Sequence, residues 1–361
     1  MCYKPQSTWK TIGIMSGTSL DGLDMAYCEF TEENGKWSFQ IIRAQTYDYD
    51  AQWKKKLSEL PGKNALTLAQ THVELGHFIG KTVKEFITSY TLKPDFIACH
   101  GHTIFHQPDK GFTLQIGEGA SIAAETGIAV VCDFRSLDVA LGGQGAPLVP
   151  IGDKLLFPDY DCCINLGGFA NISYNAFYKR IAFDICPVNI VINHLSELLG
   201  KKFDENGELA RTGKLHLELF QALNQLAFYK TPPPKSLGKE WVEKNVFPLL
   251  QQYSLPIPDL IRTVTEHAAY QISVVINSIS GNTSEHTTLV TGGGAKNIFL
   301  TKLLRKYCNS HLYIPNNLII DYKEALIFAF LGILRMQKKA NCLQSVTGAR
   351  IDNTGGCVYE P

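Results

Sequence analysis

The first residues whose types suit chemistry lie between two short apolar segments, in the stretch IGIMSGTSLDGLDMAYCEF (residues 12–30). Small and hydroxylated residues at 16–19 would let backbone N–H groups approach phosphate oxygens without steric bulk. Asp21 and Asp24 would then hold Mg²⁺ through water beside those phosphates. The alternative is a plain hairpin turn made by Asp21 and Gly22, and on this stretch alone the hairpin is the better interpretation.

A second glycine cluster occurs in TLVTGGGAKNIFL (residues 288–300), which predicts a buried strand, a triple-glycine turn and the start of a helix. Asn297 stands where a side chain caps the helix or contacts a ligand at its N-terminus. The pattern indicates a nucleotide pocket, although such turns are common in α/β proteins. The chain contains neither GxxxxGK[ST] nor GxGxxG after a strand, so the usual phosphate and dinucleotide fingerprints do not apply.

A lone carboxylate, Asp184, stands in FDICPVNIVIN (residues 183–193), at the end of an apolar segment and before a helix that opens with Pro187. In a cleft it would accept a proton from a nucleophile, as an aspartate near a transferred phosphate does. The alternative, a helix N-cap or first-turn acid, is at least as well supported by position alone.

Histidines and a carboxylate are concentrated between residues 99 and 150. His100 and His102 share a face of one strand end, His106 follows, and with Asp133 they would suit a zinc ion that activates water. A metal-dependent hydrolase is therefore a distant alternative, because nothing in the sequence brings Asp133 to the histidines. Arg135 beside Asp133 favours a fork for a carboxylate or for sugar oxygens instead.

Length and composition limit the remaining possibilities. The 361 residues (40.1 kDa) suggest two domains, and 34 basic against 34 acidic residues argue against a nucleic-acid partner. No apolar leader and no run of about 20 apolar residues is present, so we expect a cytoplasmic protein without a membrane segment. Ten cysteines without a CxxC pair predict reduced, mostly buried thiols.

The order of the predicted elements indicates a duplicated architecture with a cleft between two halves. The first half opens with strands at 12–16, 25–30 and 37–46, helices at 49–60 and 66–90, and a strand at 96–99. The second opens with strands at 162–166, 172–174 and 181–183 and a helix at 188–199. The apolar run at 325–334 predicts a buried helix, with an exposed stripe for a dimer as the alternative.

Nine segments together are similar to the anhydro-N-acetylmuramic acid kinases, sugar kinases of the actin, hexokinase and Hsp70 superfamily. They are MSGTSLDGLD, HGHT, FTLQIGEGASIAAETGIAVVCDFRSLDVALGGQGAPLVP, INLGGFANIS, FDICPVN, PPKSLGKEW, TGGGAKN, KEALIFAFLG and SVTGA. They follow the family's order over almost the whole chain.

The resemblance implies an α/β, two-lobed actin/hexokinase-like (ribonuclease H-like) duplicated fold with an interdomain cleft. We expect an N-terminal lobe at residues 1–145 and a C-terminal lobe at residues 146–361. The last segment of the chain is a candidate to pack against the N-terminal lobe. It also implies ATP and Mg²⁺ as cofactors, an anhydrosugar substrate, cell-wall recycling in the cytoplasm and a possible homodimer. Family members add water at the anomeric carbon while the freed O6 takes the γ-phosphate of ATP.

The family's functional positions carry over residue by residue. Asp184 is implied as the catalytic base, and Asp21 as the metal ligand. The implied nucleotide-binding residues are Gly17, Thr18, Ser19, Leu20, Asp21, Gly22, Asp24, Gly167, Gly168, Asn171, Gly292, Gly293, Gly294 and Asn297. The implied sugar-binding residues are Thr103, Asp133, Arg135 and Glu324, among which Arg135 would clamp the lactyl carboxylate.

The chain departs from the family beside Asp184. Where the family has Phe-Asp-Thr-Gly-Pro-Gly-Asn and a further Asp, this chain has Ile185, Cys186, Val188 and Asn193. These side chains would disfavour positive φ and cannot donate to a phosphate in the same way. His102 also replaces an expected Gln. Besides the active kinase, a kinase for another anhydrosugar and a sugar- and nucleotide-binding pseudokinase therefore stay open.

Overall fold

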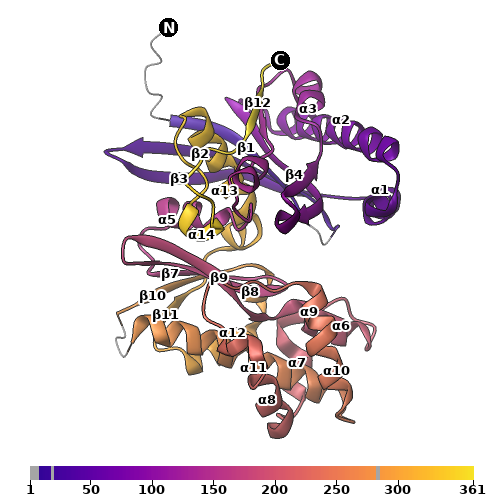
Figure 1. Cartoon of the computed structure of the whole chain (residues 1–361), viewed down its shortest axis with the longest axis vertical. Coiled ribbons are helices and arrows are strands. Elements are labelled where there is room, and N and C mark those ends of the chain that lie inside the picture. The colour runs from indigo at the N-terminus through magenta and orange to yellow at the C-terminus, as the bar shows by residue number, and fades with distance from the viewer. Residues whose placement is uncertain (1–7, 18–19, 282–284) are drawn as a thin grey trace. The chain divides into compact units, whose positions relative to one another are not determined.

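The computed structural model describes residues 8–17, 20–281 and 285–361 (Figure 1). The chain forms two units: unit 1 is Met1–Phe157 with Tyr322–Pro361, and unit 2 is Pro158–Asp321. Compared with the expected lobes, the boundary lies after Phe157 instead of after residue 145, and the C-terminal segment belongs to unit 1. Each unit is described by itself.

The sheet of unit 1 has the strand order β12-β6-β4-β1-β2-β3, with β5 paired to β4. Its strands are β1 (Thr8–Ser16), β2 (Gly22–Glu33), β3 (Lys36–Asp48), β4 (Phe96–Gln107), β5 (Phe112–Ile116), β6 (Val130–Cys132) and β12 (Cys357–Tyr359). β1, β2 and β3 form an antiparallel meander, and β4 and β6 continue it in parallel. The predicted hairpin between the first two strands is confirmed.

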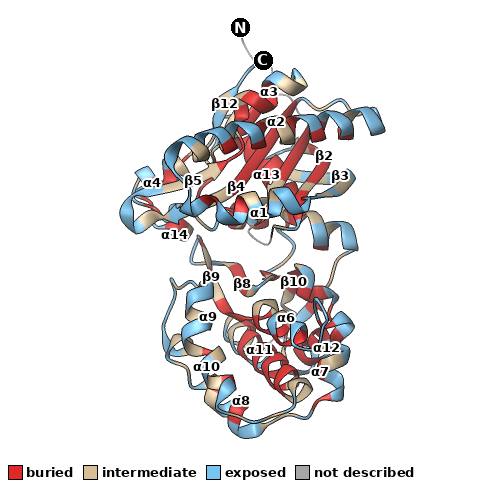
Figure 2. Ribbon diagram, turned by 90° about the vertical axis from the view of Figure 1, so that its right-hand side faces the viewer, coloured by how far each residue is buried: buried red, intermediate tan, exposed pale blue. Residues whose placement is uncertain are grey.

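The helices of unit 1 cover this sheet with amphipathic faces. They are α1 (Ala51–Glu59), α2 (Ala65–Tyr90), α3 (Gly119–Thr126), α4 (Ser136–Ala140), α5 (Val149–Leu156) and α14 (Gln344–Thr347), with short 3₁₀ turns η1 (Leu60–Gly62) and η2 (Pro108–Lys110). In α2 the buried side chains of Leu75, Ile79, Val83 and Phe86 recur at helical spacing, so one stripe faces the core. Other residues of α2, among them Glu74, Lys81 and Glu85, are exposed, and Figure 2 shows the mixed colouring of this helix.

Helix α13 (Asn317–Met336) crosses the boundary between the units and enters unit 1 at Tyr322. Its residues 325–334 are buried, so the alternative of an exposed apolar stripe on this segment is wrong. The close packing depends on Gly13 of β1, because a Cβ there would lie 1.8 Å from the carbonyl oxygen of Ala325. This contact ties the C-terminal segment to the first strand of the chain.

The sheet of unit 2 repeats the arrangement, with the order β11-β10-β7-β8-β9. Its strands are β7 (Cys162–Leu166), β8 (Phe169–Ala176), β9 (Lys179–Pro187), β10 (Thr287–Thr291) and β11 (His311–Tyr313). β7, β8 and β9 are again an antiparallel meander, extended in parallel by β10 and β11. The predicted duplicated α/β architecture is confirmed by this shared strand order.

The helices of unit 2 pack around α11, which contributes much of the core. They are α6 (Asn189–Glu197), α7 (Glu208–Thr212), α8 (Leu217–Asn224), α9 (Lys239–Asn245), α10 (Phe247–Gln251), α11 (Ile257–Ser280) and α12 (Ile298–Tyr307), with 3₁₀ turns η3 (Glu205–Gly207), η4 (Ala227–Lys230) and η5 (Gly293–Lys296). Figure 2 shows α11 largely in the colour of buried residues.

Two sequence expectations concern the chain as a whole. None of the helices in the described residues is long and apolar enough to cross a membrane. The cysteines at the described positions are free thiols, and six of them are buried: Cys28, Cys99, Cys162, Cys163, Cys186 and Cys342.

Candidate active site

The carboxylate of Asp184 is held by the segment between η4 and α9. Its Oδ2 accepts the backbone N–H of Leu237 (2.8 Å), and its own backbone N–H donates to the carbonyl oxygen of Lys235 (3.1 Å). β9 continues past Asp184 to Pro187, and the N-cap of α6 is Val188. The interpretation of Asp184 as a helix cap is therefore wrong, as is the expected strand end at this residue.

The surroundings of Asp184 suit a proton acceptor. Burial raises the pKa of the Asp184 carboxyl, and the hydrogen bond from Leu237 acts in the opposite direction. A raised pKa makes a carboxylate a stronger base, provided that it is ionised at the working pH. Asn171 of β8 lies directly opposite Asp184 in the antiparallel register. The two positions predicted for catalysis and nucleotide binding thus share one face of the sheet.

The residues that depart from the family pattern beside Asp184 point into the core. Ile185, Cys186 and Val188 are all at most 1% exposed and belong to the apolar core of unit 2. The register pairs Asn171 with Asp184 and Ala170 with Cys186, so Ile185 is the extra residue of a β-bulge. The bulge breaks the alternation and buries two consecutive side chains. None of the three has a positive φ, so the backbone here does not require glycine. The fourth departure, Asn193, is half-buried on α6.

The triple-glycine turn follows β10 and contains glycines of two kinds. Gly292 has φ 82°, and a Cβ there would lie 2.5 Å from Oδ1 of Asn165. At Gly294 a Cβ would meet Cβ of Leu166 at 2.8 Å. At Gly293, however, no described atom lies within 4 Å of such a Cβ. Packing therefore requires glycine at 292 and 294, whereas at 293 it leaves space through which a ligand could reach the backbone.

The other glycine turn of unit 2 joins β7 to β8. The carbonyl of Gly168 accepts the N–H groups of Val188 (2.8 Å) and Ile190 (3.2 Å), and that of Gly167 accepts the N–H of Asn189 (3.3 Å). These bonds attach the turn to the first residues of α6. The Gly167–Gly168 pair, Asn171 and Asp184 are therefore fixed to one another within unit 2.

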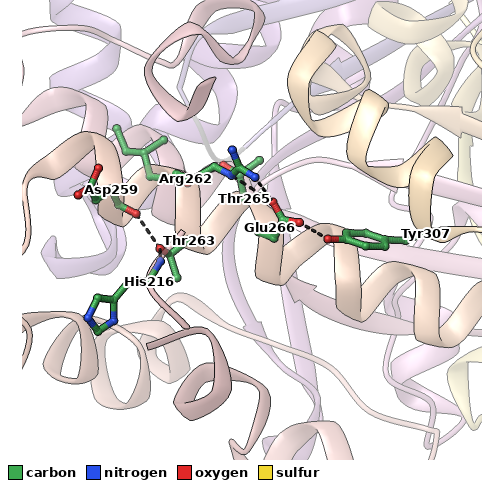
Figure 3. A network of polar contacts seen from close by, with 8 residues as sticks. His216, Asp259, Arg262, Thr263, Thr265, Glu266 and Tyr307 are labelled. Carbon is green, nitrogen blue, oxygen red and sulfur yellow. Dashed lines mark hydrogen bonds and ion pairs between the residues drawn. The ribbon is translucent and has the colours of Figure 1, made fainter. Parts of the chain in front are cut away.

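Helix α12, which starts beside the triple-glycine turn, is anchored at both ends. Asn297 caps it, since its Oδ1 accepts the N–H of Leu300 (2.9 Å). At the other end Tyr307 donates its hydroxyl to the buried carboxylate of Glu266, which also receives Nη2 of Arg262 at 2.7 Å (Figure 3). Because Glu266 and Arg262 belong to α11, α12 is fixed to the central helix. The capping role of Asn297 is confirmed, and contact with a ligand stays a prediction.

In unit 1 the turn between β1 and β2 holds the first predicted phosphate segment. The N–H of Leu20 donates to the carbonyl of Gly17 (3.3 Å), and Leu20 has φ 60°. A Cβ at Gly22 would lie 2.3 Å from the carbonyl oxygen of Tyr47, so packing requires glycine there. Asp21 is exposed, and Asp24 accepts the hydroxyl of Thr46 (2.6 Å). Thr18 and Ser19 lie outside the described residues.

Ser16 is buried below this turn and joins it to β4. Its hydroxyl lies 2.9 Å from Nδ1 of His102 and 2.9 Å from the hydroxyl of Tyr49. The N–H of Tyr49 in turn donates to the carbonyl of Asp21 (3.1 Å). Burial lowers the pKa of His102 to about 4, so its imidazole is neutral at pH 7. Ser16 and His102 thus act as a structural link at the edge of the turn.

The predicted sugar side of unit 1 is built around Arg135. Its Nε donates to Nε2 of His100 (2.9 Å) and its Nη1 to the carbonyl of Gly145 (2.6 Å). Burial lowers the pKa of Arg135 to about 10, which still leaves the guanidinium charged at neutral pH. Burial raises the pKa of Glu324, and Arg135 opposes that shift. The structure therefore brings Arg135 and Glu324 within electrostatic reach of each other.

The other two predicted sugar-binding residues, Asp133 and Thr103, lie on different elements: Asp133 follows β6, and Thr103 is in β4. Asp133, with φ 56°, accepts the hydroxyl (2.5 Å) and the N–H (3.3 Å) of Ser136, and it lines a cavity of about 180 Å³ together with His100 and Gln115. Thr103 on β4 accepts Nε2 of Gln115 (3.3 Å). Gln115 thus links the cavity to Thr103.

The histidines do not form the zinc site that was considered from the sequence. Nδ1 of His100 bonds to the carbonyl of Gly101 (2.9 Å) and its Nε2 to Arg135, while His102 bonds to Ser16. His106 is exposed and bonds to Thr113. Over the described ranges, no three His, Cys, Asp or Glu side chains are grouped to hold a metal ion.

Sequence reasoning missed two contributors to these sites. His100 was considered as a metal ligand or as a polar residue satisfied at a strand end, whereas it accepts a hydrogen bond from Arg135 and so orients that side chain. Leu237 acts through its backbone N–H, which no side-chain pattern reveals. The only available signal was the position of both residues in segments that resemble the family.

The duplicated α/β sheet, with glycine turns after β7 and β10, is the architecture of the actin/hexokinase-like sugar kinases. The sequence profile of the family "Anhydro-N-acetylmuramic acid kinase" matches residues 9–361. The chain belongs to this family of ATP-dependent sugar kinases.

Curated relatives agree with this assignment. The anhydro-N-acetylmuramic acid kinase of Pasteurella multocida (strain Pm70) is 35% identical, over 98% of this chain and 97% of its own. That of Francisella tularensis subsp. novicida (strain U112) is 36% identical over 94% and 95%. Among solved structures, a ROK family glucokinase from Streptomyces griseus in complex with glucose and AMPPNP covers 89% of this chain with TM-score 0.42 and 11% identity. Because that likeness is distant, the description of the fold rests on the strand order given above.

Proposed function

We propose that this protein hydrolytically opens 1,6-anhydro-N-acetylmuramic acid and phosphorylates O6 with ATP, giving N-acetylmuramic acid 6-phosphate in peptidoglycan recycling. Family membership over almost the whole chain supports the substrate. The observation that carries the reaction is Asp184, a half-buried carboxylate with a raised pKa and one oxygen held by a backbone donor.

In the proposed reaction Asp184 takes a proton from water as the water oxygen bonds to the anomeric carbon. The bond from that carbon to O6 breaks, and O6 accepts the γ-phosphoryl group of ATP, so ADP leaves and the water proton stays with Asp184. The base contributes about 10²–10⁴-fold to such a step. Sugar, water and ATP thus give the 6-phosphate, ADP and one proton.

The other predicted residues have roles consistent with their surroundings. Arg135 would bind the lactyl carboxylate, because His100 and Gly145 orient its guanidinium. The turn at Gly17–Asp24 and the turn from Gly292 to Asn297 would bind the nucleotide phosphates through backbone N–H groups.

The acidic residues of the first turn fit a magnesium site. Asp21 is exposed directly after the turn, as a carboxylate must be to share Mg²⁺ with phosphate oxygens. Mg²⁺, when bound with ATP, would neutralise charge on the transferred phosphoryl group. Asp21 would hold the ion, and Asp24, bonded to Thr46, would support it through water.

The packing beside Asp184 supports an active kinase over a sugar-binding pseudokinase. Ile185, Cys186 and Val188 fill the core of unit 2, while Asp184 lies on the other side of β9. Their apolar character is thus explained without a change at the reacting carboxylate. From the resemblance alone we also propose that the protein is cytoplasmic and forms a homodimer. Light scattering after size-exclusion chromatography tests the homodimer.

The deciding experiment incubates the purified protein with ATP, Mg²⁺ and 1,6-anhydro-N-acetylmuramic acid. Mass spectrometry should find a product heavier by one water and one phosphoryl group, and in ¹⁸O-water the label should reside on the anomeric carbon. Absence of the product, with both ligands raising the melting temperature, would instead indicate a pseudokinase or another anhydrosugar.

A further inference from the structure

Polar residues form a continuous row across four strands of the sheet in unit 2. The register pairs Thr291 with Asn165, Asn165 with Asn171, and Asn171 with Asp184. Thr291 directly precedes the triple-glycine turn. The row therefore leads from that turn to the proposed base, with Asn165 in the strand next to the turn.

The row lies on the face of the sheet opposite the apolar core. The neighbours of Asn165 in β7, Ile164 and Leu166, belong to that core, and so do Ile172 of β8 and Phe183 of β9. Because side chains alternate along a strand, the asparagines and Asp184 point to the other face. Neighbouring strands are about 4.8 Å apart, which places Asn165 roughly 10 Å from Asp184 along the row.

The side-chain amide of Asn165 lies between the two glycine turns of unit 2. Its Oδ1 is 2.5 Å from the place that a Cβ of Gly292 would take, and its Nδ2 is 3.3 Å from the corresponding place at Gly167. A side chain at position 292 would therefore collide with this amide, and one at position 167 would be crowded by it. Gly293, next along the chain, leaves room for a ligand.

The amide of Asn165 also differs from those of its neighbours in its bonding. Nδ2 of Asn189 donates to the carbonyl of Leu166 (3.2 Å), and Oδ1 of Asn297 caps α12. Among the described residues, by contrast, no hydrogen-bond partner is found for the half-buried side chain of Asn165. An amide that no protein group occupies can bond to water in the free protein and can exchange that water for a ligand that enters between the two turns.

We propose that Asn165 contacts the nucleotide, donating Nδ2–H to an oxygen of the terminal phosphate of ATP between the two glycine turns. This rests on the proposed function for the nature of the nucleotide. The terminal phosphate is assigned because Asp184, where the water would be activated, stands at the other end of the same row. The amide is suited to the contact because it donates a hydrogen bond without adding a charge to the row.

The test compares Asn165→Asp, which keeps the shape and replaces the donor by an acceptor, with wild type. Binding of a non-hydrolysable ATP analogue, measured calorimetrically with Mg²⁺, should weaken about tenfold or more, since a hydrogen bond to a charged group is lost. ADP binding should change less than threefold. Asn175→Asp places the same charge on the same face of β8 and should leave both affinities unchanged.

Asn165→Ala keeps the test decisive if the aspartate variant does not fold, and it should show the same selective loss. Unchanged analogue binding in either folded variant, or an equal loss of ADP and analogue binding, would overturn the assignment. These outcomes are separate from the proposed reaction. If wild type turns over the sugar and the variants bind the analogue normally, only the role of Asn165 is refuted. If wild type shows no turnover but the variants lose analogue binding selectively, only the proposed reaction is refuted.

Discussion

Leu237 donates its backbone N–H to Oδ2 of Asp184 across 2.8 Å, and this bond assigns different roles to the two carboxylate oxygens. Oδ2 is oriented by the loop, and Oδ1 is the oxygen that we expect to accept the proton. The bond also stabilises the ionised form, in opposition to burial.

Removing the charge of Asp184 should abolish turnover and leave binding intact. We expect Asp184→Asn to lower kcat by about 10²–10⁴-fold, the usual contribution of a positioned base. The affinity for ATP should remain within twofold of wild type, as calorimetry can measure. Substantial product formation by this variant would assign the base to another residue.

The same variant should be more stable than wild type at neutral pH. Because burial raises the folded-state pKa of Asp184 above its usual value of about 3.9, the folded state binds the proton more tightly than the unfolded chain. Wild type therefore loses stability as the pH rises from that value through the folded-state pKa. The melting temperature of Asp184→Asn should exceed that of wild type at pH 7, by more than it does at pH 4.5. An equal difference in melting temperature at both pH values would show that burial does not raise the folded-state pKa of Asp184.

The backbone donor can be tested with a pair of substitutions at Leu237. Leu237→Pro removes the N–H, whereas Leu237→Ala keeps it and serves as the control. A lost hydrogen bond to a charged group amounts to about 1.5–3 kcal/mol, or roughly one to two pKa units. The acidic limb of the kcat/KM profile should therefore move to higher pH in the proline variant alone. A profile that coincides with wild type would show that the bond does not tune the base.

The surroundings of Asp184 show where prediction from sequence succeeds and where it stops. The strands of the two antiparallel meanders and the glycine turns are local features, carried by apolar runs and by residues with special backbone freedom, and they were predicted. The short strands β5, β6, β11 and β12 were not. The β-bulge at Ile185 was not, because it depends on the register with β8. As a consequence the apolar departures were expected to face a ligand, whereas they are packed in the core.

The residues that make contacts between distant parts of the chain could not be predicted either. The resemblance alone allowed the return of the C-terminal segment to unit 1, but not the packing of Gly13 against Ala325, more than 300 residues apart. Likewise, the pairing of His100 with Arg135 depends on the neighbouring positions of β4 and β6. Such relationships arise from packing of whole elements, and a single sequence carries no local signal for them.

The triple-glycine turn offers a comparison between packing and ligand binding. Gly292→Ala forces a side chain into positive φ and against Asn165, which should cost about 2 kcal/mol, or roughly 4–8 °C in Tm. Gly293→Ala meets no described atom within 4 Å, so its Tm should match wild type. If this position faces the nucleotide, however, its KM for ATP should rise several-fold. Normal ATP kinetics in Gly293→Ala would place the nucleotide elsewhere.

The final prediction concerns how Arg135 selects the sugar. Its Nε and Nη1 are held by His100 and Gly145, which orients the rest of the guanidinium for a carboxylate. Arg135→Lys keeps the charge but loses the planar fork, so the KM for 1,6-anhydro-N-acetylmuramic acid should rise about tenfold while the KM for ATP stays constant. 1,6-Anhydro-N-acetylglucosamine, which lacks the lactyl carboxylate, should be a poor substrate for wild type and for the variant alike. The ratio of kcat/KM for the two sugars should therefore fall in Arg135→Lys. If both sugars lost activity equally, Arg135 would support the fold of the pocket and another group would recognise the carboxylate.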